Sequence, residues 1–233
     1  MYTEVGRHSI RSPHHNNQDA CQAYTHRLKF VAGKGRGELF VVVDGASSSK
    51  ASGDAAGAAV QAWRQLFTME NRPDFDAFKA IAQSIDRDVA AMSGRDEDDE
   101  KPVAAMTALW LHPSGTGYFA HVGDTVGYRM LCDENSSFMA FTADHSDGHA
   151  LMRYLGKDDP AQFQFGTFPI EPGETFVLVS DGVPKGLEVD RIRALAMDDV
   201  EEGAHQIVVG ARKRGSTDDI TALVIYLDDF EDE

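Results

Sequence analysis

Two short apolar runs that both end in Asp-Gly decide the architecture of this 233-residue chain: residues 41–45 (VVVDG) and residues 176–182 (FVLVSDG). An apolar run of this length is typical of a buried β-strand. Asp-Gly then marks the exit of the strand, where the chain turns and leaves a carboxylate at the edge of the sheet. Two such strands side by side would bring two carboxylates together, and oxygen-rich sites of this kind bind Mg²⁺ or Mn²⁺.

The remaining elements read as strands that come in runs and helices that come in pairs. Strands are predicted at 107–111, 117–122, 127–131, 138–142, 175–180 and 220–227, and residues 28–43 read as two strands around a glycine turn at 33–37. Helices are predicted at 51–69, from the N-cap Asp74 to about Val89, at 189–197 and at 200–213. This order indicates an α+β fold with antiparallel sheet, because alternating βαβ units are missing.

Composition narrows the class of protein and its partners. The length of the chain favours one domain spanning residues 1–233. With 38 acidic and 22 basic residues the net charge is −16, which disfavours nucleic acid and anionic membranes as partners. Acidic runs at 96–100 and 228–233 read as a solvated loop and a tail. The N-terminus lacks the plan of a signal peptide and no apolar stretch reaches the ~20 residues of a membrane span, so the cytoplasm is the expected location.

The two cysteines, Cys21 and Cys132, have no Cys-x-x-Cys spacing, so neither a thiol redox motif nor a zinc site is indicated. A disulfide between them is compatible with the sequence but not implied by it. Neither cysteine lies in a loop that could cradle a phosphate, so the chemistry of a cysteine-based phosphatase is not indicated.

Aspartates recur at or just after the predicted strand ends, and each taken alone is an ordinary turn residue. They are Asp44, Asp124, Asp144, Asp181 and Asp218, with Asp19 in the opening Asn-Gln-Asp-Ala. The order of the motifs that contain these aspartates is more informative about function than any single aspartate. The motifs 17–19 (NQD), 43–45 (VDG), 106–108 (MTA), 121–125 (HVGDT), 142–146 (TADHS), 180–182 (SDG) and 216–221 (STDDIT) follow one another along the chain. In this order the chain resembles the metal-dependent protein phosphatases of the 2C type, and most closely a bacterial branch of that family.

The resemblance covers nearly the whole chain and implies both a fold and an activity. The implied fold is a four-layer α-β-β-α sandwich, in which two antiparallel sheets are flanked by helices. The implied activity is hydrolysis of phosphoserine and phosphothreonine on proteins, by a water that bridges two Mn²⁺ or Mg²⁺ ions and without a covalent intermediate. A phosphoprotein substrate follows, and with it a serine/threonine kinase that produces the substrate.

The resemblance also implies site residues. The metal ligands carried over are Asp19, Asp44, Asp181, Asp218 and the carbonyl of Gly45, with Asp124 at a third, weaker site. Asp44 and Asp181 would serve catalysis through the bridging water. Asp219 stands where the family usually has asparagine, so either of the two adjacent aspartates could be the ligand. This chemistry agrees with the residues themselves, since several carboxylates share a small space only when cations neutralise them.

The chain departs from the family pattern at three places. Ala46 follows the first Asp-Gly, where many members have a histidine that serves as general acid; a metal-bound water, His8 or His145 are the alternatives. His14 stands where an arginine often grips the substrate phosphate, so Arg7, Arg11 and His14 are the phosphate-binding candidates. Little chain remains between residues 144 and 169 for the flap that many members carry, which predicts a reduced or absent flap and an open site.

Two other functions remain open at this stage. The first is a phosphatase-like binding or regulatory module that has lost turnover, an alternative motivated by Ala46 and His14. The second is a phosphatase of small phosphorylated molecules. The retained carboxylates argue against the binding module, since unused buried acids are costly to a fold.

Overall fold

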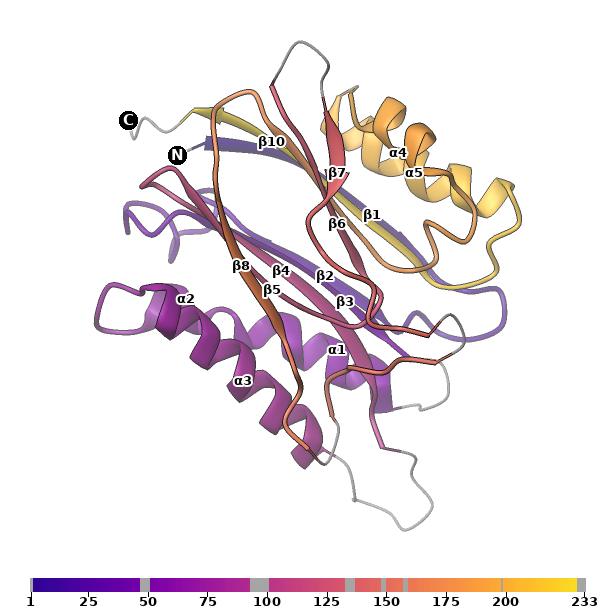
Figure 1. Ribbon diagram of the computed structural model, residues 1–233, viewed down its shortest axis with the longest axis horizontal. Helices are drawn as coiled ribbons and strands as arrows, with labels where there is room; N and C mark the ends of the chain where they lie inside the picture. Colours follow the sequence, from indigo (N-terminus) through magenta and orange to yellow (C-terminus); the bar gives the residue numbers. More distant parts are fainter. Residues whose placement is uncertain are drawn as a thin grey trace.

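Two five-stranded antiparallel sheets stack face to face at the centre of the structure, and helices cover both outer faces (Figure 1). The computed structural model describes residues 2–46, 51–92, 101–132, 137–147, 150–156, 159–197 and 199–229. One sheet has the order β1 (Tyr2–Ile10), β10 (Ile220–Asp229), β9 (Thr175–Val179), β6 (Val126–Met130) and β7 (Phe138–Ala140). The other has the order β2 (Asp19–Tyr24), β3 (Glu38–Gly45), β4 (Ala104–His112), β5 (Thr116–Val122) and β8 (Gln164–Pro169). The predicted four-layer sandwich is confirmed.

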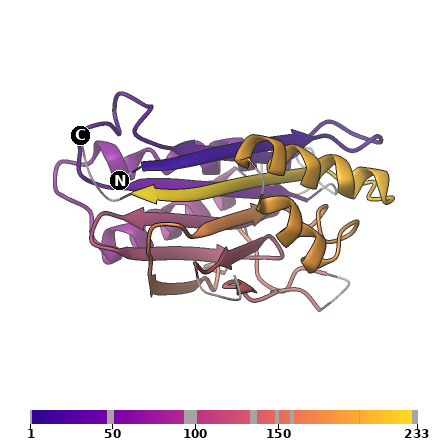
Figure 2. The ribbon, with the colours of Figure 1, turned by 90° about the horizontal axis from the view of Figure 1, so that it is seen from above.

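The helices divide between the two faces according to their place in the chain. The helices α1 (Ala51–Ala62), α2 (Gln65–Thr68) and α3 (Phe75–Ala91) pack on the β2–β8 sheet, and α4 (Val189–Ala196) and α5 (Val200–Lys213) pack on the other. Figure 2 shows β1 beside β10, so the first and last strands are neighbours. In the part of the chain that the structure describes, no helix combines the length and apolarity needed to cross a membrane.

Alternation along the strands produces three apolar layers. In β3, Leu39, Val41 and Val43 face α1–α3, whereas Phe40 and Val42 face the space between the sheets. Because both faces of the strand are buried, its sequence is one continuous apolar run. The central strand β9 behaves in the same way, which explains why the two Asp-Gly runs predict their strands so clearly.

Some sequence-based element boundaries were wrong. Residues 28–34 form turns rather than a strand, and the backbone N–H groups of Val31 and Ala32 donate to the Leu28 carbonyl. The strands β1, β2 and β8 were missed. All three lie at sheet edges, where one side of the strand meets solvent and polar residues interrupt the apolar pattern. The predicted helix 51–69 divides into α1 and α2.

The expected cap of the second predicted helix is confirmed. Asp74 caps α3, since its side chain accepts a hydrogen bond from the Ala77 backbone N–H. Cys21 and Cys132 are free thiols. The acidic run 96–100 and the end of the acidic tail at 230–233 lie outside the described residues.

Candidate metal centre

Four carboxylates converge at one edge of the sandwich, from strands of both sheets. Asp19 begins β2 and is the register partner of Asp44 near the end of β3. Asp181 follows β9, and its backbone N–H lies 3.4 Å from Oδ2 of Asp44. Asp124 occupies the turn between β5 and β6. One carboxylate oxygen from each of Asp44, Asp124 and Asp181 lies within 4.8 Å of the other two.

The glycines of the two Asp-Gly pairs are needed for close packing rather than for a turn. A Cβ on Gly45 would lie 2.7 Å from the carbonyl oxygen of Ser52 and 2.8 Å from that of Gln18. A Cβ on Gly182 would lie 2.0 Å from the Asp219 carbonyl oxygen. Neither glycine has a positive φ, and Gly45 still belongs to β3. The two Asp-Gly pairs therefore mark two places where the end of a strand packs backbone against backbone with a distant part of the chain.

Asp19 is held in one orientation and retains a free coordination position. Its Oδ2 accepts hydrogen bonds from the hydroxyls of Ser180 at 2.8 Å and Thr221 at 2.7 Å. Its Oδ1 is buried without a hydrogen-bond partner. Burial raises the pKa of Asp19 to about 7, against the two hydroxyl hydrogen bonds, which lower it. A buried oxygen of this kind is costly unless a cation binds there.

The pKa values of the other three carboxylates are also raised, because burial and mutual repulsion disfavour their charged forms. Burial, followed by repulsion from Asp19 and Asp181, raises the pKa of Asp44 well above its usual range. Burial and the charge of Asp181 raise the pKa of Asp124 to about 6. Burial also raises the pKa of Asp181. These groups ionise together only beside a positive charge, so the donor set fits a hard divalent cation such as Mg²⁺ or Mn²⁺.

Lys185 supplies a positive charge that sequence analysis missed. Its Nζ lies 2.5 Å from Oδ2 of Asp181 and 2.7 Å from Oδ2 of Asp218. The sequence signal for this contact was the spacing, because Lys185 follows Asp181 by four residues. In the structure the backbone N–H of Lys185 donates to the Asp181 carbonyl, as in a helical turn. Lys185, Asp124 and Asp181 line one side of a groove of about 490 Å³.

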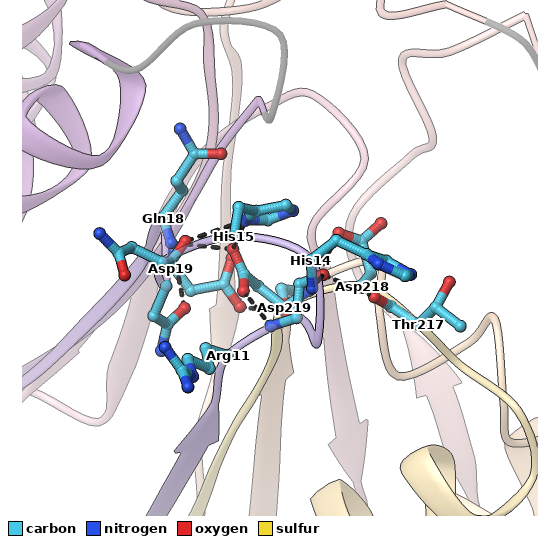
Figure 3. A network of polar contacts seen from close by, with 12 residues as sticks. Arg11, His14, His15, Gln18, Asp19, Thr217, Asp218 and Asp219 are labelled. Atoms are coloured by element: carbon cyan, nitrogen blue, oxygen red, sulfur yellow. Dashed lines mark hydrogen bonds and ion pairs between the residues drawn. The ribbon is translucent and has the colours of Figure 1, made fainter.

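The adjacent aspartates 218 and 219 have different surroundings (Figure 3). The Asp219 side chain is buried, and its two oxygens accept the backbone N–H groups of Ser12 at 2.6 Å and Gln18 at 2.8 Å. It therefore ties the loop between β1 and β2 to the start of β10. Asp218 is partly exposed and faces Lys185. Of the two, Asp218 lies beside Asp181 and is placed to share a cation with it.

The three phosphate-binding candidates do not lie together. Arg11 and His14 line a cavity of about 800 Å³ formed by the β1–β2 loop and the start of α1. Figure 3 shows this loop next to Asp19 and Asp219. Arg7, in the middle of β1, lines a separate cavity of about 260 Å³, and its charge acts on the Cys21 thiol.

The model of the family "Protein phosphatase 2C" matches residues 5–207. The chain belongs to the protein phosphatase 2C family. No curated protein sequence matches it.

Solved phosphatase structures share its fold. The catalytic domain of the serine/threonine protein phosphatase PstP, in complex with two manganese ions, superposes with a TM-score of 0.82 at 21% identity, covering 97% of this chain and 99% of that one. Stp1 from Staphylococcus aureus gives 0.82 at 16% identity, with 98% and 96% covered. The phosphatase MsPP from Mycobacterium smegmatis, in complex with cacodylate, gives 0.76 at 22% identity, with 96% and 98% covered. The predicted membership of the family is confirmed.

In this protein phosphatase 2C chain, the two histidines considered as general acids, His8 and His145, have contacts outside the carboxylate cluster. The ring of His8 packs edge-on against His205 of α5, with centroids 4.8 Å apart. The Nδ1 atom of His145 accepts the Gly123 backbone N–H at 3.3 Å, and burial lowers its pKa. His145 therefore supports the turn that carries Asp124.

A buried polar chain lies beneath the same turn. His121 Nε2 donates to the Ala143 carbonyl at 2.8 Å, because a carbonyl oxygen only accepts. Nδ1 then accepts the Thr107 hydroxyl at 2.9 Å, and Thr107 accepts the Thr125 hydroxyl at 2.8 Å. Burial lowers the pKa of His121 to about 4, which keeps the ring neutral and the direction of the chain unchanged near neutral pH.

Proposed function

We propose that this chain is a metal-dependent phosphatase that hydrolyses phosphoserine and phosphothreonine on proteins. The observation that carries the proposal is the convergence of Asp44, Asp124 and Asp181, whose carboxylate oxygens lie within 4.8 Å of one another in a chain of the protein phosphatase 2C family. Strands from both sheets supply them, so the complete fold is needed to assemble the cluster.

We assign two ions, Mn²⁺ or Mg²⁺, to Asp19, Asp44, Asp181, Asp218 and the Gly45 carbonyl, and a third, weaker one to Asp124. The raised pKa values of the buried aspartates, the unpartnered Oδ1 of Asp19 and the manganese ions of the similar PstP structure support this assignment. When bound, paired divalent ions lower the pKa of water and stabilise negative charge on a phosphoryl group.

The side chains around the cluster supply orientation. Ser180 and Thr221 hold Asp19 through its Oδ2, which leaves Oδ1 available to a cation. Arg11 and His14 are the proposed phosphate-binding residues, because they line a cavity together with Gln18, the residue before Asp19, whereas Arg7 lines a different cavity. Ala46 carries no proton donor, so protonation of the leaving serine or threonine oxygen uses a group other than the residue after Gly45.

We further propose that residues 1–233 act as one catalytic domain with a reduced or absent flap. In its support, the described residues between β7 and β8 form only the isolated bridges Ser146–Leu151 and Ala104–Leu155. The proposal extends to cytoplasmic signalling, with substrates produced by a serine/threonine kinase. The net charge of −16, which disfavours nucleic acid and anionic membranes, supports protein substrates.

The test is phosphate release from phosphoserine and phosphothreonine peptides, with Mn²⁺ or Mg²⁺ and with EDTA. We expect metal-dependent release that falls at least 100-fold in Asp44→Asn and Asp181→Asn. Asp190→Asn, an exposed aspartate in the first turn of α4, is the matched control and keeps full activity. Release that ignores EDTA would overturn the mechanism. Tight Mn²⁺ binding without hydrolysis would favour the binding module, and hydrolysis restricted to small esters would favour the small-molecule phosphatase.

A further inference from the structure

The ammonium group of Lys185 lies against two carboxylates that the proposed metal centre uses. Lys185 stands on the turn after β9, where Val183 N–H donates to the Ser180 carbonyl and Lys185 N–H donates to that of Asp181. This turn directs the lysine side chain back along Asp181. Its Nζ then reaches Oδ2 of Asp181 at 2.5 Å and Oδ2 of Asp218 at 2.7 Å.

We propose that Lys185 is an internal counterion of the metal centre: its ammonium neutralises Asp181 and Asp218 in the metal-free protein, and a divalent ion that uses these two carboxylates must displace it. The inference rests on the proposed function, because it requires the carboxylate cluster to be a metal site. It goes further in assigning a role to a basic residue that lies outside the ligand set.

The charges around Lys185 support this role. Nζ contacts two carboxylates at ion-pair distance and half of the Lys185 side chain is exposed, so its ammonium keeps the positive charge that lysine carries near neutral pH. Among the described residues, Lys185 is the basic side chain that forms ion pairs with this cluster.

A divalent ion that binds Oδ2 of both Asp181 and Asp218 needs the space between these two oxygens, which Nζ of Lys185 occupies at 2.5 Å from one and 2.7 Å from the other. Cation binding between these residues therefore requires the ammonium to leave. The space for this movement exists, because half of the Lys185 side chain is exposed and it borders the groove of about 490 Å³.

Displacement has a measurable consequence for affinity. The ion pairs of Lys185 are lost when the metal binds, and the displaced ammonium then lies near a divalent cation. Both effects weaken metal binding, so removal of the lysine charge strengthens it. Two partly exposed ion pairs of this geometry correspond to about a tenfold change in affinity.

The experiment is calorimetric titration of the metal-free protein with MnCl₂ at constant ionic strength. We expect Lys185→Met, which keeps the length of the side chain and removes its charge, to bind Mn²⁺ about tenfold more tightly than the wild type. Lys185→Arg, which keeps the charge, should bind within threefold of the wild type. Lys213→Met, a change of an exposed lysine at the end of α5, is the matched control and should leave the affinity unchanged.

A second readout is thermal unfolding in EDTA, where Lys185→Met should melt at a lower temperature because Asp181 and Asp218 lose their counterion. Unchanged or weaker Mn²⁺ binding by Lys185→Met, in a protein with a native circular dichroism spectrum, would overturn the proposal, and so would absence of Mn²⁺ binding by every variant. A third outcome is that the wild type binds Mn²⁺ and Lys185→Met binds it more tightly, but the protein releases no phosphate. This outcome would refute the proposed enzyme activity and leave Lys185 as the counterion.

Discussion

Replacement of Asp219 by asparagine tests which of two adjacent aspartates is structural and which binds metal. Asp219 is 3% exposed, and its carboxylate accepts two backbone N–H groups, from Ser12 and Gln18. An asparagine side chain has one acceptor oxygen and a donating amide group, so one of the two N–H groups loses its partner. A buried donor without an acceptor costs about 1–3 kcal/mol. Loss of the repulsion between Asp219 and Asp19 offsets part of this cost, which places the expected loss of stability in the lower half of that range.

The companion variant is Asp218→Asn, which changes the same charge one residue away. The Asp218 side chain is 34% exposed, and its ion pair with the half-exposed Lys185 contributes at most about 1 kcal/mol. Its Oδ1 accepts the Asp219 backbone N–H, a bond that an asparagine oxygen retains. We therefore expect this variant to unfold within about 1 kcal/mol of the wild type and to lose metal affinity at least tenfold.

The assay combines urea unfolding in EDTA, followed by circular dichroism, with calorimetric titration of Mn²⁺. Asp219→Asn should shift the urea midpoint at an unchanged slope and keep its Mn²⁺ affinity within a few-fold of the wild type. The opposite pattern, in which Asp219→Asn leaves the midpoint in place but abolishes Mn²⁺ binding, would refute the assignment of Asp219 as the tie between the β1–β2 loop and β10.

Three further predictions concern the same edge of the sandwich. Burial raises the pKa of Asp19 from 3.8 in the unfolded chain to about 7, so the protonated carboxyl stabilises the metal-free protein below about pH 4. This contribution of at most about 4 kcal/mol is lost as the pH rises through 7. Urea midpoints in EDTA should therefore fall between about pH 5 and pH 8, and saturating Mn²⁺ should flatten this dependence. Gly182→Ala places a Cβ 2.0 Å from the Asp219 carbonyl oxygen and should cost about 1–3 kcal/mol or more in thermal unfolding, whereas Gly57→Ala, with open space around it, should not destabilise the protein. Thr107→Val leaves His121 Nδ1 without its donor and should cost about 1–3 kcal/mol, which an unchanged melting temperature would contradict.

The central strands and the family were predictable because their signals are local. Residues 41–45 and 176–182 are continuous apolar runs, and both faces of β3 and β9 are buried. The order of the motifs along the chain was sufficient to indicate the protein phosphatase 2C family, which the family comparison bears out. The edge strands β1, β2 and β8 were missed, because polar residues on their open sides remove the periodic pattern.

The roles of individual charged residues at the site were decided by contacts between distant parts of the chain. The sequence shows two adjacent aspartates, but only the approach of the β1–β2 loop brings Ser12 and Gln18 to Asp219 and leaves Asp218 facing Lys185. A lysine four residues after an aspartate is unremarkable in a sequence, and the second partner of Lys185 lies 33 residues further on.

The sequence alone therefore determined the apolar strand runs, the set of aspartates and the family, since these depend on residue type and order. Only the tertiary structure decided why each Asp-Gly contains glycine, which aspartate is structural and which cation lies against the cluster. The physical reason is that hydrogen bonds, close backbone contacts and Coulomb interactions depend on distance in space, and here they join strands from both sheets.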